Sequence, residues 1–248
     1  MITPHVVPGV TTGELDRLCD EYTLKHGAVS APLNYRGFPR SICTSVNHVV
    51  CHGIPNDTKR LSEGDIINID VTVKLEGWHG DTSRMFPVGE IKVLPRRLID
   101  VTYKAMMMGI ETVRPGSKLS EIGRVIQAYV EAERFSVVED FCGHGIGQTF
   151  HDAPSVLHYN RSRMRGRGTS AYGPRHDLVF QEGMFLTIEP MVNAGRPDTF
   201  LMADGWTAVT KDKKPSAQFE HSVGVTGDGV EIFTVSPKGL HHPPYDLT

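Results

Sequence analysis

The chain has 248 residues, a formal net charge of −3 at pH 7, and 39% hydrophobic and 22% charged residues. This length allows one or two domains with a sizeable core, and the composition is typical of a soluble globular protein. The small negative charge gives no reason to expect nucleic acid as the main partner. The sequence has no run of 18 or more apolar residues, so neither a membrane-spanning helix nor a membrane partner is expected.

The cysteines and the start of the chain predict a cytoplasmic protein. The opening MITPHVVPGV is too short and too rich in proline for a signal peptide. Without C-x-x-C spacing a structural zinc site is not expected, and a disulfide framework is not expected at this length. Free thiols without an export signal point to the cytoplasm. The cysteines are Cys19, Cys43, Cys51 and Cys142.

Three helices are predicted from apolar stripes and end signals. The first has apolar residues at i, i+3, i+4 and i+7 in LDRLCDEY, and Thr11 and Glu14 have capping-box spacing just before it. The second starts near Pro95, a tolerated first-turn proline, and ends before Pro115. The third repeats the stripe of the first at Ile122, Val125, Ile126 and Tyr129.

Strands alternate with these helices, which predicts a mixed α/β (α+β) protein. A further segment, RSRMRGRGTSAYGPRH at 161–176, is rich in Arg, Gly and Ser without periodicity and is typical of an inserted surface loop. The strands are predicted from β-branched and aromatic content at 65–74, 81–87, 136–142, 184–192, 206–210, 219–225 and 230–235.

Two pairs of similar segments indicate an internal repeat. PGVTTGELDRLCDEY near the start resembles PGSKLSEIGRVIQAY near the middle of the chain, and EGDIINIDVTV aligns without gaps with EGMFLTIEPMV. The second alignment sets Asp70 against Glu189. A repeated fold that keeps a carboxylate at the same strand position is expected to build a site on a two-fold axis.

The repeat predicts one domain over 1–248 with two halves, at about 1–92 and about 93–240. The halves are expected to pair into one antiparallel sheet with helices on its outer face. The internal two-fold makes a monomer sufficient.

Asp70 and Asp81 are the first candidate site residues. A hairpin turning at Leu75-Glu76-Gly77 would place them opposite each other, with Cβ atoms roughly 4.5–5.5 Å apart. Carboxylates so close repel each other unless a cation lies between them. The alternative for Asp70, inside the apolar strand IINIDVTV, is a structural acid bonded to backbone or arginine.

Histidines and a further acid complete the candidate cluster. His144 and His151 lie in FCGHGIGQTFHDAP, where glycines let a ligand approach the imidazole closely. Glu220 lies inside a strand pattern in AQFEHSVGV. The alternatives are solvent-exposed loop histidines and an outward-facing glutamate. Together the set suits two divalent ions bridged by carboxylates; its members are Asp70, Asp81, His144, Glu189 and Glu220.

Several ordered motifs resemble type I methionine aminopeptidase, the bacterial form. They are NHVVCHGIP, GDIINIDVTVKLEGWHGDTSRMF, CGHGIGQTFHDAP, TIEPMVNAG and AQFEHSVGVT, and the resemblance runs from about Pro8 to about Thr234. It implies the pita-bread fold, with two pseudo-symmetric halves forming one curved sheet. It also implies a dinuclear metal centre held by Asp70, Asp81, His144, Glu189 and Glu220.

The resemblance also implies roles for residues around that centre. His52 would lie beside the substrate, His151 would contact the scissile peptide group, and Glu189 would shuttle a proton as well as bind metal. Phe38 stands where a tyrosine is common and Pro32 where a cysteine is common, so the fine shape of the pocket differs while it stays apolar. The methionine side chain would be held by Tyr35, Phe38, Cys43, Phe150 and Trp206.

The activity implied is removal of the N-terminal methionine from peptides and nascent proteins whose second residue is small. The ions could be cobalt, manganese, iron or zinc. Alternatives are an aminopeptidase of another specificity, or a non-catalytic binding protein for nascent chains or RNA. The arginines of 161–176 would suit contact with RNA or the ribosome, although a solvated loop is favoured.

The family usually has one more helix before the segment that matches Pro8, and its mate in the repeat is the helix near Pro95. We therefore expect apolar sheet surface in the first half to be exposed, and a version extended upstream to be more stable and less prone to aggregate. The alternative is that the Arg-rich insertion or another chain covers this surface.

Overall fold

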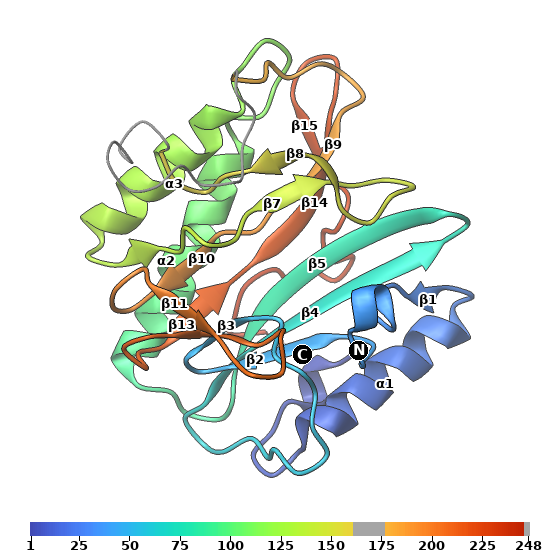
Figure 1. Ribbon diagram of the computed structural model, residues 1–248, viewed down its shortest axis with the longest axis vertical. Helices are drawn as coiled ribbons and strands as arrows, with labels where there is room; N and C mark the ends of the chain where they lie inside the picture. The colour runs from blue at the N-terminus through green and yellow to red at the C-terminus, as the bar shows by residue number, and fades with distance from the viewer. Residues whose placement is uncertain (161–176, 246–248) are drawn as a thin grey trace.

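Two long antiparallel strands, β4 (Ile66–Leu75) and β5 (Trp78–Pro87), form one half of the central sheet (Figure 1). The computed structural model describes residues 1–160 and 177–245, so the predicted insertion at 161–176 lies outside the described residues. The first half also contains η1 (Thr3–His5), α1 (Thr12–Lys25), β1 (Val29–Ser30), η2 (Tyr35–Gly37), β2 (Cys43–Val46) and β3 (Val49–Cys51).

The second half begins with two helices, α2 (Val93–Ile110) and α3 (Ser120–Ala132). Its strands are mostly short. They are β6 (Ser136–Val137), β7 (Gly143–Gly145), β8 (Asp152–Val156), β9 (Phe185–Ile188), β10 (Met191–Asn193), β11 (Thr199–Leu201), β12 (Ala208–Thr210), β13 (Ser216–Gln218), β14 (Glu220–Val225) and β15 (Val230–Ile232).

The main sheet joins both halves. Among the described residues it has nine strands, in the order β1-β4-β5-β14-β9-β7-β8, with β2 also paired to β4 and β15 to β14. The strands that pair within it are antiparallel. The pair β4–β5 mirrors the pair β9–β14 across the junction of β5 with β14, as the repeat predicts. The expectation that both halves join in one antiparallel sheet is confirmed, while the boundaries of the two halves stay a prediction. Among the described residues there are also two three-stranded sheets, β13-β10-β6 and β11-β12-β3.

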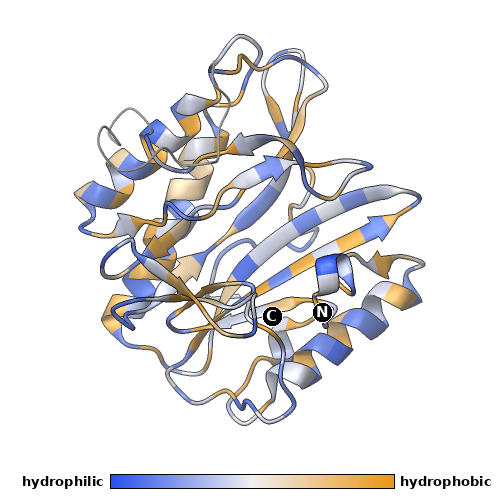
Figure 2. Cartoon of the chain, in the orientation of Figure 1, coloured by the Kyte–Doolittle hydropathy of each residue, from blue (hydrophilic) through white to orange (hydrophobic). Residues whose placement is uncertain are grey.

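The helices form where the apolar stripes predict them, and they cover the sheet. The Thr11 hydroxyl accepts from the Glu14 N–H at 3.1 Å, which confirms the predicted cap of α1. Leu15 is fully buried, whereas Tyr22 at the end of the stripe is 46% exposed. The outward side of α1 is mostly hydrophilic (Figure 2). Helices α2 and α3 pack together and close the larger apolar core beneath β9, β10 and β13.

The predicted hairpin register is wrong by two residues. Leu75 pairs with Trp78, so the turn consists of Glu76 and Gly77 alone, with φ values of 50° and 89°. Positive φ at both positions is the turn whose twist matches that of a two-stranded hairpin. Asp70 therefore pairs with Ser83, and Asp81 pairs with Thr72. The two aspartates are diagonal neighbours on one face rather than directly opposite.

Other predicted strands are shorter or broken. The strand predicted at 184–192 stops at Ile188 and resumes at Met191, because Pro190 has no N–H to donate to a sheet. The strand predicted at 136–142 covers only two residues, and the one at 206–210 begins at Ala208. The strand at 219–225 is confirmed from residue 220.

The expectation of an exposed sheet surface in the first half is wrong for Ile67, Ile69 and Phe86, which are 0%, 2% and 5% exposed. Ile2 and Tyr245 pack against their cluster, and the rings of Phe86 and Tyr245 lie 5.0 Å apart. The Tyr245 hydroxyl also donates to the Met85 carbonyl at 2.8 Å. Within the described parts of the chain, no helix has the length and apolar character needed to cross a membrane.

Gly123 sets how closely α3 approaches the segment that directly follows β8. A methyl group there would lie 2.7 Å from the Leu157 carbonyl oxygen and 2.8 Å from the Tyr159 nitrogen. We expect Gly123→Ala to lower the free energy of unfolding by about 1–3 kcal/mol, because backbone atoms cannot move aside cheaply. Gly147→Ala, which meets only the Trp78 ring at 3.4 Å, is the control. Equal urea midpoints for the two variants would contradict this packing argument.

Candidate metal centre

Five neighbouring strands converge on one cavity of about 280 Å³. In sheet order these are β4, β5, β14, β9 and β7, and each brings one candidate residue to the cavity wall. Glu189 follows the last residue of β9, and the other four lie within their strands. The residues, in the same order, are Asp70, Asp81, Glu220, Glu189 and His144.

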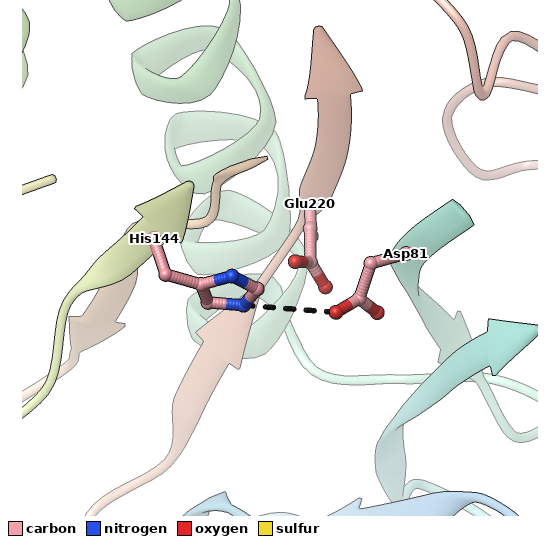
Figure 3. Close-up of side chains that lie close together, drawn as sticks. All are labelled: Asp81, His144 and Glu220. Atoms are coloured by element: carbon pink, nitrogen blue, oxygen red, sulfur yellow. Dashed lines mark ion pairs between the residues drawn. The ribbon is translucent and has the colours of Figure 1, made fainter. Parts of the chain in front are cut away.

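His144 points between the acidic side chains (Figure 3). Its Nε2 atom lies 3.7 Å from Asp81 Oδ2 and 3.7 Å from Glu189 Oε1. Ligand atoms of Asp81, His144 and Glu220 all lie within 4.8 Å of one another. The structure thus brings together residues that are far apart in the sequence.

The proton on His144 can be placed from its hydrogen bond. Nδ1 lies 3.0 Å from the Gly145 carbonyl oxygen, and a carbonyl can only accept, so Nδ1 carries the proton. Burial lowers the pKa of His144, which keeps the ring neutral. Nε2 therefore presents a lone pair to two carboxylates.

The carboxylates are in an unfavourable environment for negative charge. Asp81 and Glu220 are 4% and 3% exposed. Burial raises the pKa of Asp81 to about 7. The pKa values of Asp70, Glu189 and Glu220 are raised well above the usual range. Burial is the largest cause, and repulsion from Asp81 is the second.

This donor set fits divalent cations. Asp70 Oδ1 is buried and has no hydrogen-bond partner among the described residues. The Thr72 hydroxyl donates to Asp81 Oδ1 at 2.7 Å, which leaves Oδ2 for the cavity. Carboxylate oxygens and one imidazole lone pair facing a common point suit hard to borderline divalent ions.

Aromatic side chains line the remainder of the same cavity. The rings of Phe38 and Trp206 meet edge to face at 5.2 Å, and those of Tyr35 and Phe150 lie 4.7 Å apart. Cys43 also lines the cavity and is 7% exposed. Every residue predicted for the substrate pocket therefore lines the cavity.

Two more histidines face this space, as the resemblance implies. His52 has a positive φ of 55°, a strained conformation for a non-glycine residue, and burial lowers its pKa to about 4. His151 Nδ1 lies 3.0 Å from the Tyr35 hydroxyl. Loss of solvent around the ring, with repulsion from His144, lowers the pKa of His151 to about 3. Both imidazoles are neutral at pH 7.

The cavity also includes residues that the sequence reasoning did not assign to the site. Arg36 lies in the one-turn helix η2 and Asp140 lies in a loop, where neither periodicity nor motif spacing shows the direction of a side chain. Cys51 and Met191 lie on short strands inside the motifs that resemble the family. Their position next to predicted site residues in those motifs is the signal that could have indicated them. The unassigned residues are Arg36, Cys51, Thr72, Asp140, Phe141, Cys142 and Met191.

Glu189 is held by three neighbours. The Thr187 hydroxyl donates to Glu189 Oε1 at 2.7 Å and accepts from the His144 N–H at 3.0 Å, so one hydroxyl joins two wall residues. Gln218 Nε2 donates to Glu189 Oε2 at 3.2 Å. The Glu189 N–H lies beyond the end of the β9 ladder, and it donates to His158 Nε2 at 3.0 Å.

Comparison with known proteins agrees with this geometry. A model of metallopeptidase family M24 matches residues 1–227. The chain belongs to metallopeptidase family M24. It is 60% identical over 245 residues to the methionine aminopeptidase of Rickettsia prowazekii, an alignment that covers 98% of this chain and 90% of that protein.

Other members of the family give the same result. The methionine aminopeptidase of Escherichia coli strain K12 is 52% identical over 236 residues, covering 95% of this chain and 85% of that protein. The crystal structure of the Rickettsia prowazekii enzyme superposes with a TM-score of 0.87 and 59% identity, covering 94% of this chain and 89% of that one. The family resemblance and the fold inferred from sequence motifs are confirmed.

His158 is expected to fix the position of Glu189 in this M24 site. Its ring is 1% exposed, and burial lowers its pKa to about 3, so Nε2 accepts as a neutral imidazole. We expect His158→Leu to cost about 1–3 kcal/mol of unfolding free energy, because the Glu189 N–H loses its acceptor. It should also weaken Mn²⁺ binding measured by calorimetry. His158→Gln, which can restore an acceptor, should recover most of both losses; equal losses in the two variants would contradict the positioning role.

Proposed function

We propose that the protein is a methionine aminopeptidase that removes the N-terminal methionine from peptides and nascent proteins when the second residue is small. One observation carries this proposal: the acidic cluster around His144 opens directly onto an aromatic pocket within the same cavity. Relatives that are 60% and 52% identical over nearly the whole chain bear the same name, which supports it.

We propose that two divalent ions are held by Asp70, Asp81, His144, Glu189 and Glu220. The buried unpartnered oxygen of Asp70 and the lone pair of His144 support this assignment. When bound, such ions supply Lewis acidity that lowers the pKa of water and polarises a carbonyl group. Cobalt, manganese, iron and zinc all suit this donor set, and availability decides among them.

The aromatic pocket is suited to the methionine side chain. The rings of Phe38, Phe150 and Trp206 would surround the unbranched thioether side chain of a substrate methionine. Burial of this side chain and contacts between its sulfur and the ring edges would favour methionine. Phe38 and Pro32 both line the wall, and both keep it apolar as expected.

The histidines supply hydrogen bonds rather than charge. If the Tyr35 hydroxyl donates to His151 Nδ1, His151 carries its proton on Nε2 and can donate to the scissile carbonyl. We propose that His52 lies beside the bound methionine; its ring lies 6.2 Å from that of Trp206, which supports this role. Both rings stay neutral at pH 7, because their lowered pKa values lie far below it.

Glu189 is the proposed proton carrier. Its carboxylate is held at Oε1 by Thr187 and at Oε2 by Gln218, so it has a fixed orientation. The loss of solvent that raises its pKa makes it a better base than an exposed glutamate. It would take a proton from the attacking water and deliver it to the leaving amine.

We also propose a cellular location and an oligomeric state from features of the chain itself. All four cysteines are free, which supports the cytoplasm, where nascent chains emerge. Both halves of the site come from one chain, so a monomer is sufficient. Contact of the Arg-rich segment with the ribosome stays a prediction. A non-catalytic binding role is not favoured, because all five cluster residues are present and line the cavity.

Turnover of short peptides tests the proposal. We expect release of methionine from Met-Ala peptides in the presence of Mn²⁺ or Co²⁺, and much slower release from Met-Leu or Met-Lys peptides. Asp70→Asn and Glu189→Gln keep the side-chain volume but remove an anionic oxygen, so activity should fall by several orders of magnitude with unchanged circular dichroism. Glu76→Gln, at the exposed hairpin tip, is the matched control. Near-control turnover by either folded variant would overturn the assignment.

A further inference from the structure

The mouth of the cavity carries an exposed cation. Among the residues that line the cavity, three are exposed: Arg36, Asp140 and His151. The other lining residues are buried or half-buried. These three side chains therefore form the rim where a peptide enters, and Arg36 is the permanently charged cation among them.

The local backbone fixes Arg36 at this rim. It is the middle residue of η2 and has a φ of 49°, in the left-handed region. Two backbone hydrogen bonds stabilise this turn. The Asn34 N–H donates to the Phe38 carbonyl at 2.8 Å, and the Phe38 N–H donates to the Tyr35 carbonyl at 3.0 Å. Since Tyr35 and Phe38 both line the aromatic pocket, Arg36 projects from the segment that builds it.

The guanidinium lies on the His151 side of the mouth. Its central carbon is 5.2 Å from the centre of the Tyr35 ring, which is a cation–π contact. The same tyrosine reaches His151 through its hydroxyl at 3.0 Å. The positive charge of Arg36 is also among the causes that lower the pKa of His151, after loss of solvent and the nearby histidines.

Arg36 has no anionic partner within the described residues, whereas some other arginines do. Arg40 pairs with Asp57 at 3.1 Å, and Arg17 with Glu21 at 2.5 Å. The rim acid Asp140 keeps its negative charge, but it accepts from the Thr199 hydroxyl at 2.5 Å and forms no ion pair with Arg36. The charge of Arg36 is thus available to a ligand at the mouth.

The proposed function fixes which part of a substrate passes Arg36. With methionine in the aromatic pocket and the scissile bond at His151, the remaining peptide leaves through the rim. In an extended peptide, side chains at alternate positions point the same way, about 6.8 Å apart. The third side chain therefore points to the same side as methionine, which is the side of Tyr35 and Arg36.

We propose that Arg36 is a specificity-determining residue that favours substrates with an acidic third residue over those with a basic one. This inference rests on the proposed aminopeptidase function, and it adds a charge preference to the small second residue. The rim is open to solvent, so the contribution is that of an exposed ion pair, which is modest and screened by salt.

The test uses C-terminally amidated peptides Met-Ala-Xaa-Gly in which the third residue is Glu, Gln or Lys. With the wild-type protein and Mn²⁺ at low ionic strength, kcat/KM for the Glu peptide should exceed that for the Lys peptide by at least about threefold. The ratio should fall toward one at high ionic strength. Arg36→Gln should abolish the preference, Arg36→Glu should reverse it, and Arg36→Lys should keep it.

Arg17→Gln, on the exposed face of α1, is the control and should leave the ratio unchanged. A Glu-to-Lys ratio near one in the wild type, or a ratio that stays the same in Arg36→Gln and Arg36→Glu, would overturn the inference. Failure of the wild type to cleave the Gln peptide would instead overturn the proposed function, so the two failures are distinguishable. The ratio remains informative if a variant loses part of its stability, because all three peptides are compared on one protein.

Discussion

Four carboxylates and the lone pair of one imidazole face the same small cavity, so the ionised cluster requires positive charge to balance the repulsion among its members. Loss of solvent raises the pKa of each acid, and Asp81 adds repulsion to the other three. No arginine or lysine lines the inner wall among the described residues; the lining cation, Arg36, is at the exposed rim. Bound divalent cations would supply the positive charge that the ionised cluster requires.

The fold is arranged to hold these groups against their repulsion. The pseudo-two-fold junction of β5 with β14 puts Asp81 and Glu220 on adjacent strands, with Glu220 paired to Ser83. Thr187 then joins His144 to Glu189 through one hydroxyl. Further out, the absence of a side chain at Gly123 lets α3 lie against the segment that carries His158. Each of these contacts restricts a wall residue to one orientation, as a metal site requires.

Much of this could be predicted from the sequence, because the internal repeat and the motif spacing both mark the wall residues. Asp70 and Glu189 are aligned by the repeat, and glycines mark His144. The hairpin register was wrong because a sequence of Leu75-Glu76-Gly77 does not show which residues adopt positive φ. The break at Pro190 can be predicted from the sequence, because a proline has no N–H to donate to a sheet, but the prediction of one strand at 184–192 does not take it into account. Arg36 lies in a turn without periodicity, so only the folded chain shows that it reaches the mouth.

The chemistry of the site and the specificity at its mouth have different physical origins. Inside, the acids are desolvated, and hydrogen bonds hold Asp81 and Glu189, so single changes should have large effects. At the rim, Arg36 is exposed and screened, so it can tune the choice among substrates without determining the reaction. The aromatic wall between them, from Tyr35 to Trp206, contributes burial of an apolar side chain, which depends little on salt.

The central claim is that the acid cluster is tolerated only because cations neutralise it. An acid whose folded-state pKa is raised contributes stability at low pH that is lost as pH rises, so the metal-free protein should have a lower free energy of unfolding at about pH 8 than at acidic pH.

The decisive measurement is the melting temperature of wild type and Glu220→Gln at this pH, with a chelator and with Mn²⁺. Without ions the variant should melt at least about 2–4 °C higher, because one repelling charge is gone. With Mn²⁺ the wild type should gain more than the variant. A metal-free variant that melts no higher than wild type, with equal gains from Mn²⁺, would contradict the account.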